Sequence, residues 1–71
     1  MTVIWREVYS SNVDKVGWDS ETEELLVQWT TGKTSAYAGV DQQQMENIAQ
    51  SWSVGSAIAS QIKPFHSHRY R

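Results

Sequence analysis

The sequence has 71 residues, carries a formal net charge of −2 and contains no cysteine. This length supports one domain with a small core, and the acidic balance disfavours nonspecific binding to nucleic acid. Disulfides and thiolate chemistry are excluded, which favours a reducing compartment. The sequence also lacks an apolar run long enough to cross a membrane and a signal-peptide pattern at its start, so we expect a cytoplasmic protein.

The first part of the chain predicts extended structure. Residues 1–8 form an extended lead-in whose pairing stays open, and residues 10–12 are a turn cluster of Ser-Ser-Asn. A strand is expected over residues 13–18, in which Gly17 indicates either a β-bulge or a close approach of another backbone or side chain. Residues 19–24 are polar and connect this strand to the next one.

The clearest pattern in the chain predicts a β-hairpin. Leu25, Val27 and Trp29 recur at the strand period of two. Gly32 in the following turn supplies the positive φ that a tight reversal needs, and residues 34–37 form the returning strand. Because short loops join these strands, the preceding strand and the hairpin are expected to pair as an antiparallel meander.

The second half of the chain predicts two helices. Asp41 is a suitable N-cap for a helix over residues 42–50, and Ser53 is a suitable N-cap for a second helix over residues 54–62. Pro64 ends that helix. The expected fold class is therefore α+β, with a three-stranded antiparallel β-meander followed by two α-helices packed on one face.

A series of short motifs runs through most of the chain in a fixed order. The motifs are Ser10-Ser11-Asn12-Val13, Val16-Gly17-Trp18-Asp19, Leu25 with Val27 and Trp29, Gly32, Tyr37 with Gly39-Val40, Ser53-Val54-Gly55-Ser56, and Ile62-Lys63 with Tyr70 and Arg71. This series resembles the KTSC domain, which occurs at the C-terminus of some lysyl-tRNA synthetases and as a free-standing bacterial protein. The resemblance covers roughly residues 9–71 and implies the same three strands and two helices.

The resemblance implies a function, and the sequence departs from the family pattern at two places. The family's attachment to a tRNA enzyme implies RNA binding. The central Tyr-x-Tyr of the family appears here as Ser35-Ala36-Tyr37, so only the second ring is kept. The aromatic-Asn pair that usually follows the family's glycine motif is replaced by Ile58-Ala59.

The residues offer little for catalysis. No serine lies in a Gly-x-Ser-x-Gly elbow, and the acidic side chains of Glu21, Glu23 and Glu24 are expected in a solvated loop without an apolar flank to shift a pKa. His66 and His68 can face one side of an extended tail, but two ligands do not complete a metal site. We expect no catalytic residue, no metal and no cofactor, with a metal-dependent hydrolase as the alternative.

The aromatic residues leave two interpretations open. Trp18, Trp29 and Tyr37 can form a stacking platform for bases on the open face of the sheet. The alternating pattern instead favours a core position for Trp29, whereas Trp18 is divided between core and surface. Trp52 lies between the two helices, either as an exposed ring or as a plug.

The C-terminal tail, residues 64–71, is the strongest candidate site. All eight acidic residues lie at or before Glu46, so the charged side chains beyond it are cationic. The candidate ligand-binding residues are Lys63, His66, His68, Arg69, Tyr70 and Arg71, joined by Tyr37 and Trp18 of the sheet. Arginine can pair with phosphate while tyrosine stacks on a base, provided that these side chains project from the fold.

These observations predict a non-enzymatic binding module. Its expected ligand is RNA or another phosphate-bearing molecule, bound through the aromatic and basic tail. The alternative is a phage-type accessory or inhibitor protein that acts by occupancy, either by binding a host protein or by sequestering a nucleotide. A homodimer through the aromatic surface is also compatible with the sequence.

Overall fold

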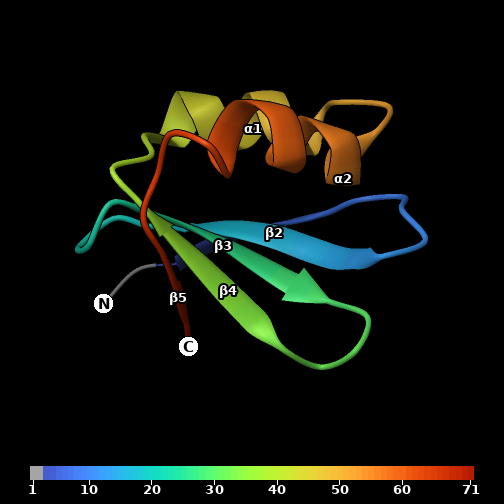
Figure 1. Ribbon diagram of the computed structural model, residues 1–71, viewed down its shortest axis with the longest axis horizontal. Helices are drawn as coiled ribbons and strands as arrows, with labels where there is room; N and C mark the ends of the chain where they lie inside the picture. Colours follow the sequence, from blue (N-terminus) through green and yellow to red (C-terminus); the bar gives the residue numbers. More distant parts are fainter. Residues whose placement is uncertain (1–2) are drawn as a thin grey trace.

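The chain folds into one antiparallel sheet with helices on one face (Figure 1). The computed structural model describes residues 3–71, and within them the sheet has five strands in the order β1-β2-β3-β4-β5. The strands are β1 (Val3–Glu7), β2 (Val13–Asp19), β3 (Glu24–Trp29), β4 (Thr34–Ala38) and β5 (His68–Tyr70). The helices are α1 (Gln42–Ala49) and α2 (Val54–Ala57), and α2 continues into a π-helical turn, η1 (Ile58–Ile62).

The predicted meander is present as β2, β3 and β4, but the prediction of three strands is wrong in number. In the described part of the chain, β1 pairs antiparallel with β2 at one edge, and β5 pairs antiparallel with β4 at the other. Each added strand supplies hydrogen-bond partners for an edge whose backbone groups would otherwise face water. The predicted lead-in is therefore mostly a strand, and its first two residues lie outside the described residues.

The hairpin of β3 and β4 forms as its sequence pattern predicts. Gly32 has a φ of +95°, and its N–H donates to the carbonyl of Trp29 at 3.0 Å. Leu25 and Val27 are fully buried and face the helices. A positive φ is costly for residues with a Cβ, so glycine at this position stabilises the reversal.

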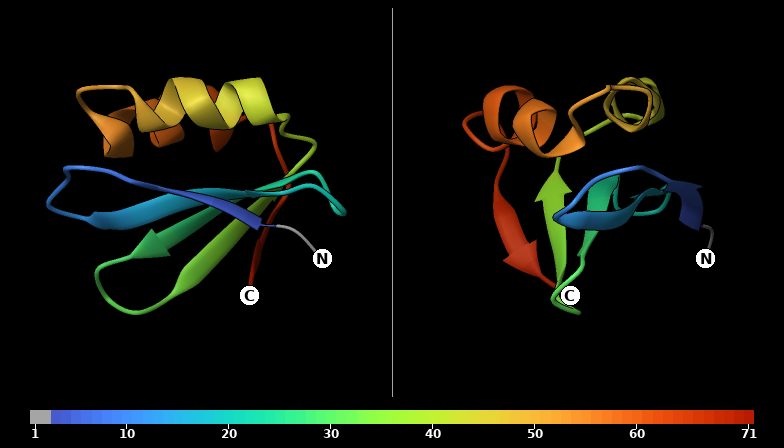
Figure 2. Two further views of the ribbon diagram at one scale, coloured as in Figure 1. Left: turned by 180° about the vertical axis from the view of Figure 1, so that it is seen from behind. Right: turned by 90° about the vertical axis from the view of Figure 1, so that its right-hand side faces the viewer.

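The helices form a layer above one face of the sheet (Figure 2). Helix α1 begins with a capping box, in which Asp41 Oδ1 accepts from the Gln44 backbone N–H and Gln44 Oε1 accepts from the Asp41 N–H. Met45 and Ile48 point from α1 into the core. Ser53 stands at the N-cap of α2 but its side chain makes no capping bond, which corrects that expectation. No helix in residues 3–71 is long and apolar enough to span a membrane.

The opposite face of the sheet carries a tight contact between β1 and β2. A Cβ added to Gly17 would lie 2.7 Å from Cε3 of Trp5, so the indole ring lies directly over the glycine. Lys15 places its ammonium 4.6 Å from the centre of the same ring. The register shift in this strand lies between Val13 and Lys15, so of the two predictions for Gly17 the close approach is correct.

Candidate functional site

The C-terminal cations are paired with acids of the same chain. Arg69 donates to Glu24 from both Nε and Nη2, each at 2.9 Å. Arg71 donates from Nη1 to Asp19 Oδ2 at 3.0 Å and lies 3.4 Å from Glu24 Oε1. The expectation that Arg69 and Arg71 project freely is therefore wrong. The β5 pairing turns their side chains toward the ends of β2 and β3, where these carboxylates lie.

The two carboxylates of this network are shielded from solvent. Glu24 is only 5% exposed and Asp19 only 1%. The Arg69 guanidinium, against an opposing effect of burial, holds the pKa of Glu24 below its ordinary value. The backbone N–H of Glu21 is the largest cause that lowers the pKa of Asp19. Glu24 thus belongs to a buried ion-pair network, and the prediction that it lies in a solvated loop is wrong.

Of the other candidate residues in the tail, the two histidines contact the sheet and Lys63 is exposed. His66 places Nδ1 2.7 Å from the carbonyl of Ala38. The ring of His68 lies between Tyr37 and Tyr70, with ring centres 5.0 and 4.7 Å apart. Lys63, just after η1, is exposed. No cluster of three potential metal ligands occurs within the described residues.

The aromatic platform predicted for the open face does not form there. Trp18, Trp29 and Tyr37 lie on the face that the helices cover, together with the core. Tyr37 is 4% exposed, and burial raises the pKa of its hydroxyl. Trp18 is partly buried and donates from Nε1 to the carbonyl of Val40 at 2.6 Å. Tyr37 and Trp18 thus stabilise the fold, whereas Trp29 is only partly buried.

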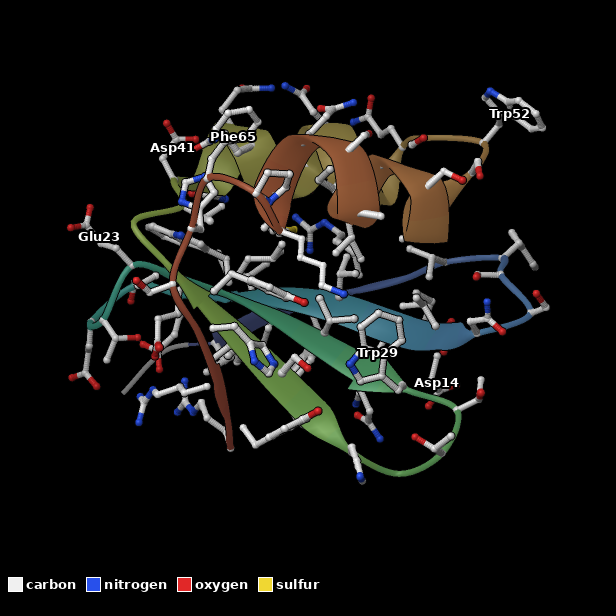
Figure 3. All side chains as sticks on the ribbon, viewed as in Figure 1. Asp14, Glu23, Trp29, Asp41, Trp52 and Phe65 are labelled. Carbon is white, nitrogen blue, oxygen red and sulfur yellow. The ribbon has the colours of Figure 1, made fainter. Side chains whose placement is uncertain are left out.

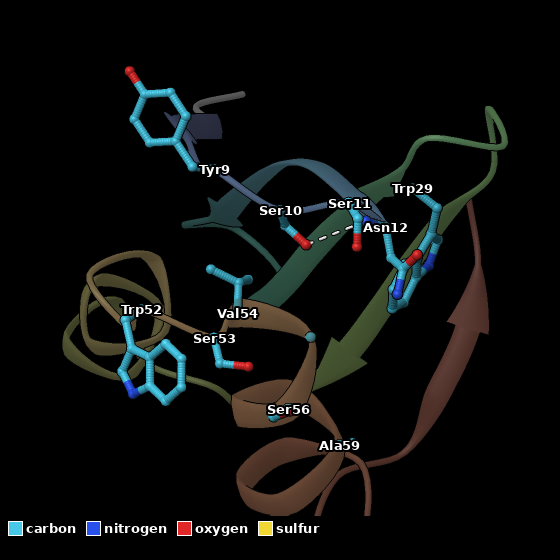
Figure 4. A pocket seen from close by; sticks show the side chains of 11 residues that line it. Tyr9, Ser10, Ser11, Asn12, Trp29, Trp52, Ser53, Val54, Ser56 and Ala59 are labelled. Atoms are coloured by element: carbon cyan, nitrogen blue, oxygen red, sulfur yellow. Dashed lines mark hydrogen bonds between the residues drawn. The ribbon is translucent and has the colours of Figure 1, made fainter.

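A pocket of about 480 Å³ lies between the β1–β2 loop and the start of α2 (Figure 4). It is lined by Tyr9, Ser10, Ser11, Asn12, Trp29, Trp52, Ser53, Val54, Gly55, Ser56 and Ala59. Two motifs that are far apart in the sequence, Ser10-Ser11-Asn12 and Ser53-Val54-Gly55-Ser56, therefore form opposite walls of one site. We call it the serine pocket.

The loop that forms one wall of the serine pocket is held in place by hydrogen bonds. Ser10 Oγ accepts from the backbone N–H groups of Asn12 at 3.2 Å and Val13 at 3.3 Å. The Asn12 carbonyl accepts from the N–H of Thr30 at 3.0 Å. These bonds fix the loop against the β3–β4 hairpin, so the wall is formed before any ligand arrives.

Two tryptophans stand at different sides of the serine pocket. Trp29 lies beside Asn12 and is oriented by a hydrogen bond from its Nε1 to Ser35 Oγ at 2.8 Å (Figure 4). Trp52 projects from the loop between α1 and α2 and is 96% exposed (Figure 3). Of the two interpretations of Trp52, the exposed ring is correct. Tyr9 is also fully exposed, but its ring extends away from the pocket (Figure 4).

The chemistry of the serine pocket is polar and uncharged. Its described lining holds hydroxyl groups, an amide and aromatic rings, with no carboxylate, imidazole, ammonium or guanidinium. Such groups donate and accept hydrogen bonds and stack on planar ligands, whereas proton transfer near neutral pH needs a titratable group. The arrangement is suited to binding.

Neither the serine pocket nor the pairing of the tail with acidic residues was predicted from the sequence. A signal for the pocket was present, because both serine motifs belong to the pattern that carried the family resemblance. What the sequence could not give was their proximity, since about 40 residues separate the two segments and only the fold brings them together.

The comparisons place this fold and these motifs in a family. The pattern of the KTSC domain matches residues 9–69, and the chain belongs to the KTSC domain family. The crystal structure of a KTSC domain protein from Yersinia pestis is similar over 99% of both chains, with a TM-score of 0.85 and 24% identity. At that identity the likeness shows the shared fold. No curated protein matches the sequence.

Proposed function

We propose that this protein is a non-enzymatic binding module that takes an unpaired base of single-stranded RNA into the serine pocket. The observation that carries the proposal is the composition of that pocket, in which hydroxyl and amide groups lie between an oriented Trp29 and an exposed Trp52. Unpaired bases are recognised through hydrogen bonds to their edges and stacking on aromatic rings. A volume of about 480 Å³ lies within the range of small-ligand pockets.

The proposal moves the RNA contact away from the tail. Because Arg69 and Arg71 already pair with Glu24 and Asp19, contact with phosphate would require breaking bonds inside the protein. The chain as a whole carries a charge of −2, which repels a polyanion at long range. Binding through the serine pocket therefore relies on stacking and hydrogen bonds and is expected to be modest in affinity.

Trp52→Ala tests the proposal. Stacking of one base on an aromatic ring contributes about 1–3 kcal/mol, so the variant should bind a short unstructured RNA about 5- to 150-fold more weakly than the parent chain. Fluorescence anisotropy of a labelled adenine-rich RNA of about ten nucleotides gives the dissociation constants. The exposure of Trp52 predicts little change in thermal stability.

Phe65→Ala is the matched control, because Phe65 is a second exposed ring, 75% accessible, outside the serine pocket. It should leave RNA binding unchanged. Equal losses in the two variants would refute a specific role for the serine pocket. No association of the parent chain with RNA at about 100 μM protein in low salt would refute the proposed function itself.

A protein partner is the second candidate, and the exposed rings favour it. Tyr9, Trp52 and Phe65 are all more than two-thirds accessible, and large aromatic residues are enriched at protein interfaces. An inhibitor that acts by occupancy would use such rings as anchors. Retention of a partner after nuclease treatment, lost with Trp52→Ala, would support this candidate. Light scattering tests whether the partner is a second copy of the chain.

A further inference from the structure

A second hollow adjoins the serine pocket. It has a volume of about 360 Å³ and is lined by Asn12, Trp29, Thr30, Thr31, Lys33 and Tyr70. We call it the lysine pocket. Asn12 and Trp29 line both pockets, so the two hollows are neighbours. We call the pair, which extends from the start of α2 to the turn of the β3–β4 hairpin, the groove.

The lysine pocket differs from the serine pocket in its charge. Lys33 lies in the hairpin turn and places its ammonium 5.6 Å from the centre of the Tyr70 ring. Tyr70 reaches this position because β5 aligns it with Ser35 of β4, and the ring is 66% exposed. No carboxylate belongs to the described lining. The pocket thus presents a cation beside an exposed aromatic ring.

Trp29 and Asn12, which line both pockets, would let a single ligand contact both of them. The Nε1 of Trp29 is bound to Ser35, which fixes the indole between the hollows. Asn12 is fixed through its backbone to Thr30, so its side chain stands at the same boundary. A ligand that runs along the groove would pass both side chains and reach the lysine pocket, where Lys33 and Tyr70 lie together. These groups suit a base in the serine pocket that is followed by a phosphate and a second base in the lysine pocket.

We propose that the groove binds at least two linked nucleotides of a single strand, with one base in the serine pocket, a phosphate on Lys33 and the next base against Tyr70. This inference rests on the proposed function and extends it from one base to a strand segment. Lys33 is the lone cation among the described residues that line either pocket, so one phosphate contact is expected. Each such contact with a single strand gives a salt slope of about −0.7 in a logarithmic plot of affinity against salt.

Two small probes separate the parts of this proposal. Adenosine has a base and no phosphate, whereas the dinucleoside monophosphate of two adenosines has two bases and one phosphate. The parent chain should bind the larger probe about 5- to 150-fold more tightly, because the second base stacks in the lysine pocket. The affinity for the larger probe should fall with salt, while that for adenosine should not. Titration calorimetry measures both probes without a label.

Lys33→Gln is the variant that tests the phosphate contact. It should remove the salt dependence of the larger probe and weaken its binding, while the affinity for adenosine stays the same. Lys63→Gln is the matched control, since Lys63 is an exposed lysine outside both pockets. It should change neither probe. Thermal unfolding of both variants checks that the hairpin keeps its stability.

The outcomes distinguish this inference from the proposed function. If adenosine and the larger probe bind equally well, or if Lys33→Gln and Lys63→Gln behave alike, the second subsite is refuted and the serine pocket alone stands. If neither probe binds at millimolar concentration and RNA also fails to bind, the proposed function is refuted and this inference falls with it.

Discussion

Gly17→Ala should destabilise the fold through a collision with Trp5. The added Cβ would lie 2.7 Å and 2.9 Å from two atoms of the indole ring and 3.0 Å from the carbonyl of Ile4, all inside the 3.4 Å at which ordinary contact begins. Overpacking of this kind costs about 1–3 kcal/mol. For a domain of this size each kcal/mol lowers the midpoint of thermal unfolding by about 4–8 °C. Urea titration and thermal scans measure both quantities.

Making Gly17→Ala in a Trp5→Ala variant tests whether the indole ring causes the loss of stability. In Trp5→Ala the two nearest atoms to the added Cβ are gone and the Ile4 carbonyl remains, so the cost of Gly17→Ala should fall by about 1 kcal/mol or more in a double-mutant cycle. Gly55→Ala is the matched control, because a Cβ there meets nothing within 4 Å. In α2 it should stabilise by up to about 1 kcal/mol. An equal cost of Gly17→Ala in both backgrounds would refute the explanation by the indole ring.

Two further predictions concern the start of α1 and the ion pairs of β5. Asp41→Ala removes the oxygen that accepts from the Gln44 N–H at 2.8 Å, so the free energy of unfolding, measured by urea titration, should fall by about 1 kcal/mol. Asparagine caps a helix about as well as aspartate, so Asp41→Asn should cost much less. Equal losses in the two variants would contradict a capping role. The pKa of Glu24 is lowered in the folded state from an ordinary value of 4.5, so its contribution to stability is present above that value and is lost as the pH falls through the lowered pKa. Glu24→Gln should therefore reduce stability more at pH 7 than at pH 3, whereas equal losses at the two pH values would show that its pairing with Arg69 contributes nothing.

Local signals in the sequence predicted the parts of the fold that depend on neighbouring residues. The hairpin follows from period-two alternation and one glycine, and the start of α1 follows from Asp41 as its N-cap. Both are present. Ser53 shows the limit of such signals, because a residue type that often caps a helix does so only when the backbone brings its oxygen to the right N–H.

Pairing between residues that are distant in the sequence could not be predicted from it. The tail was expected to project because nothing near it in the sequence indicates a binding partner, yet Arg69 donates to Glu24, 45 positions away. The same holds for Tyr37, whose burial depends on its register opposite Leu25 and on the helices that cover that face. The error about the tail and the error about the stacking platform thus have one cause, which is that side-chain surroundings are set by strands distant in sequence.

Two of the residues at which this chain departs from the family pattern lie in different parts of the structure. Ser35 stands where the family pattern has its first tyrosine, and it is buried in β4, where its Oγ accepts a hydrogen bond from Trp29 Nε1 at 2.8 Å. Ala59 stands where relatives have asparagine, and it is an exposed residue on the wall of the serine pocket.

The serine pocket is built mainly from loop residues and helix ends, whereas the buried core comes from strands and inward helix faces. Its outer positions, such as Ser56 and Ala59, can consequently change without repacking the interior. Substitutions at those positions would change the chemistry of the pocket wall and leave the core packing as it is. A designer could exploit the same separation by randomising the pocket rim and leaving the interior untouched.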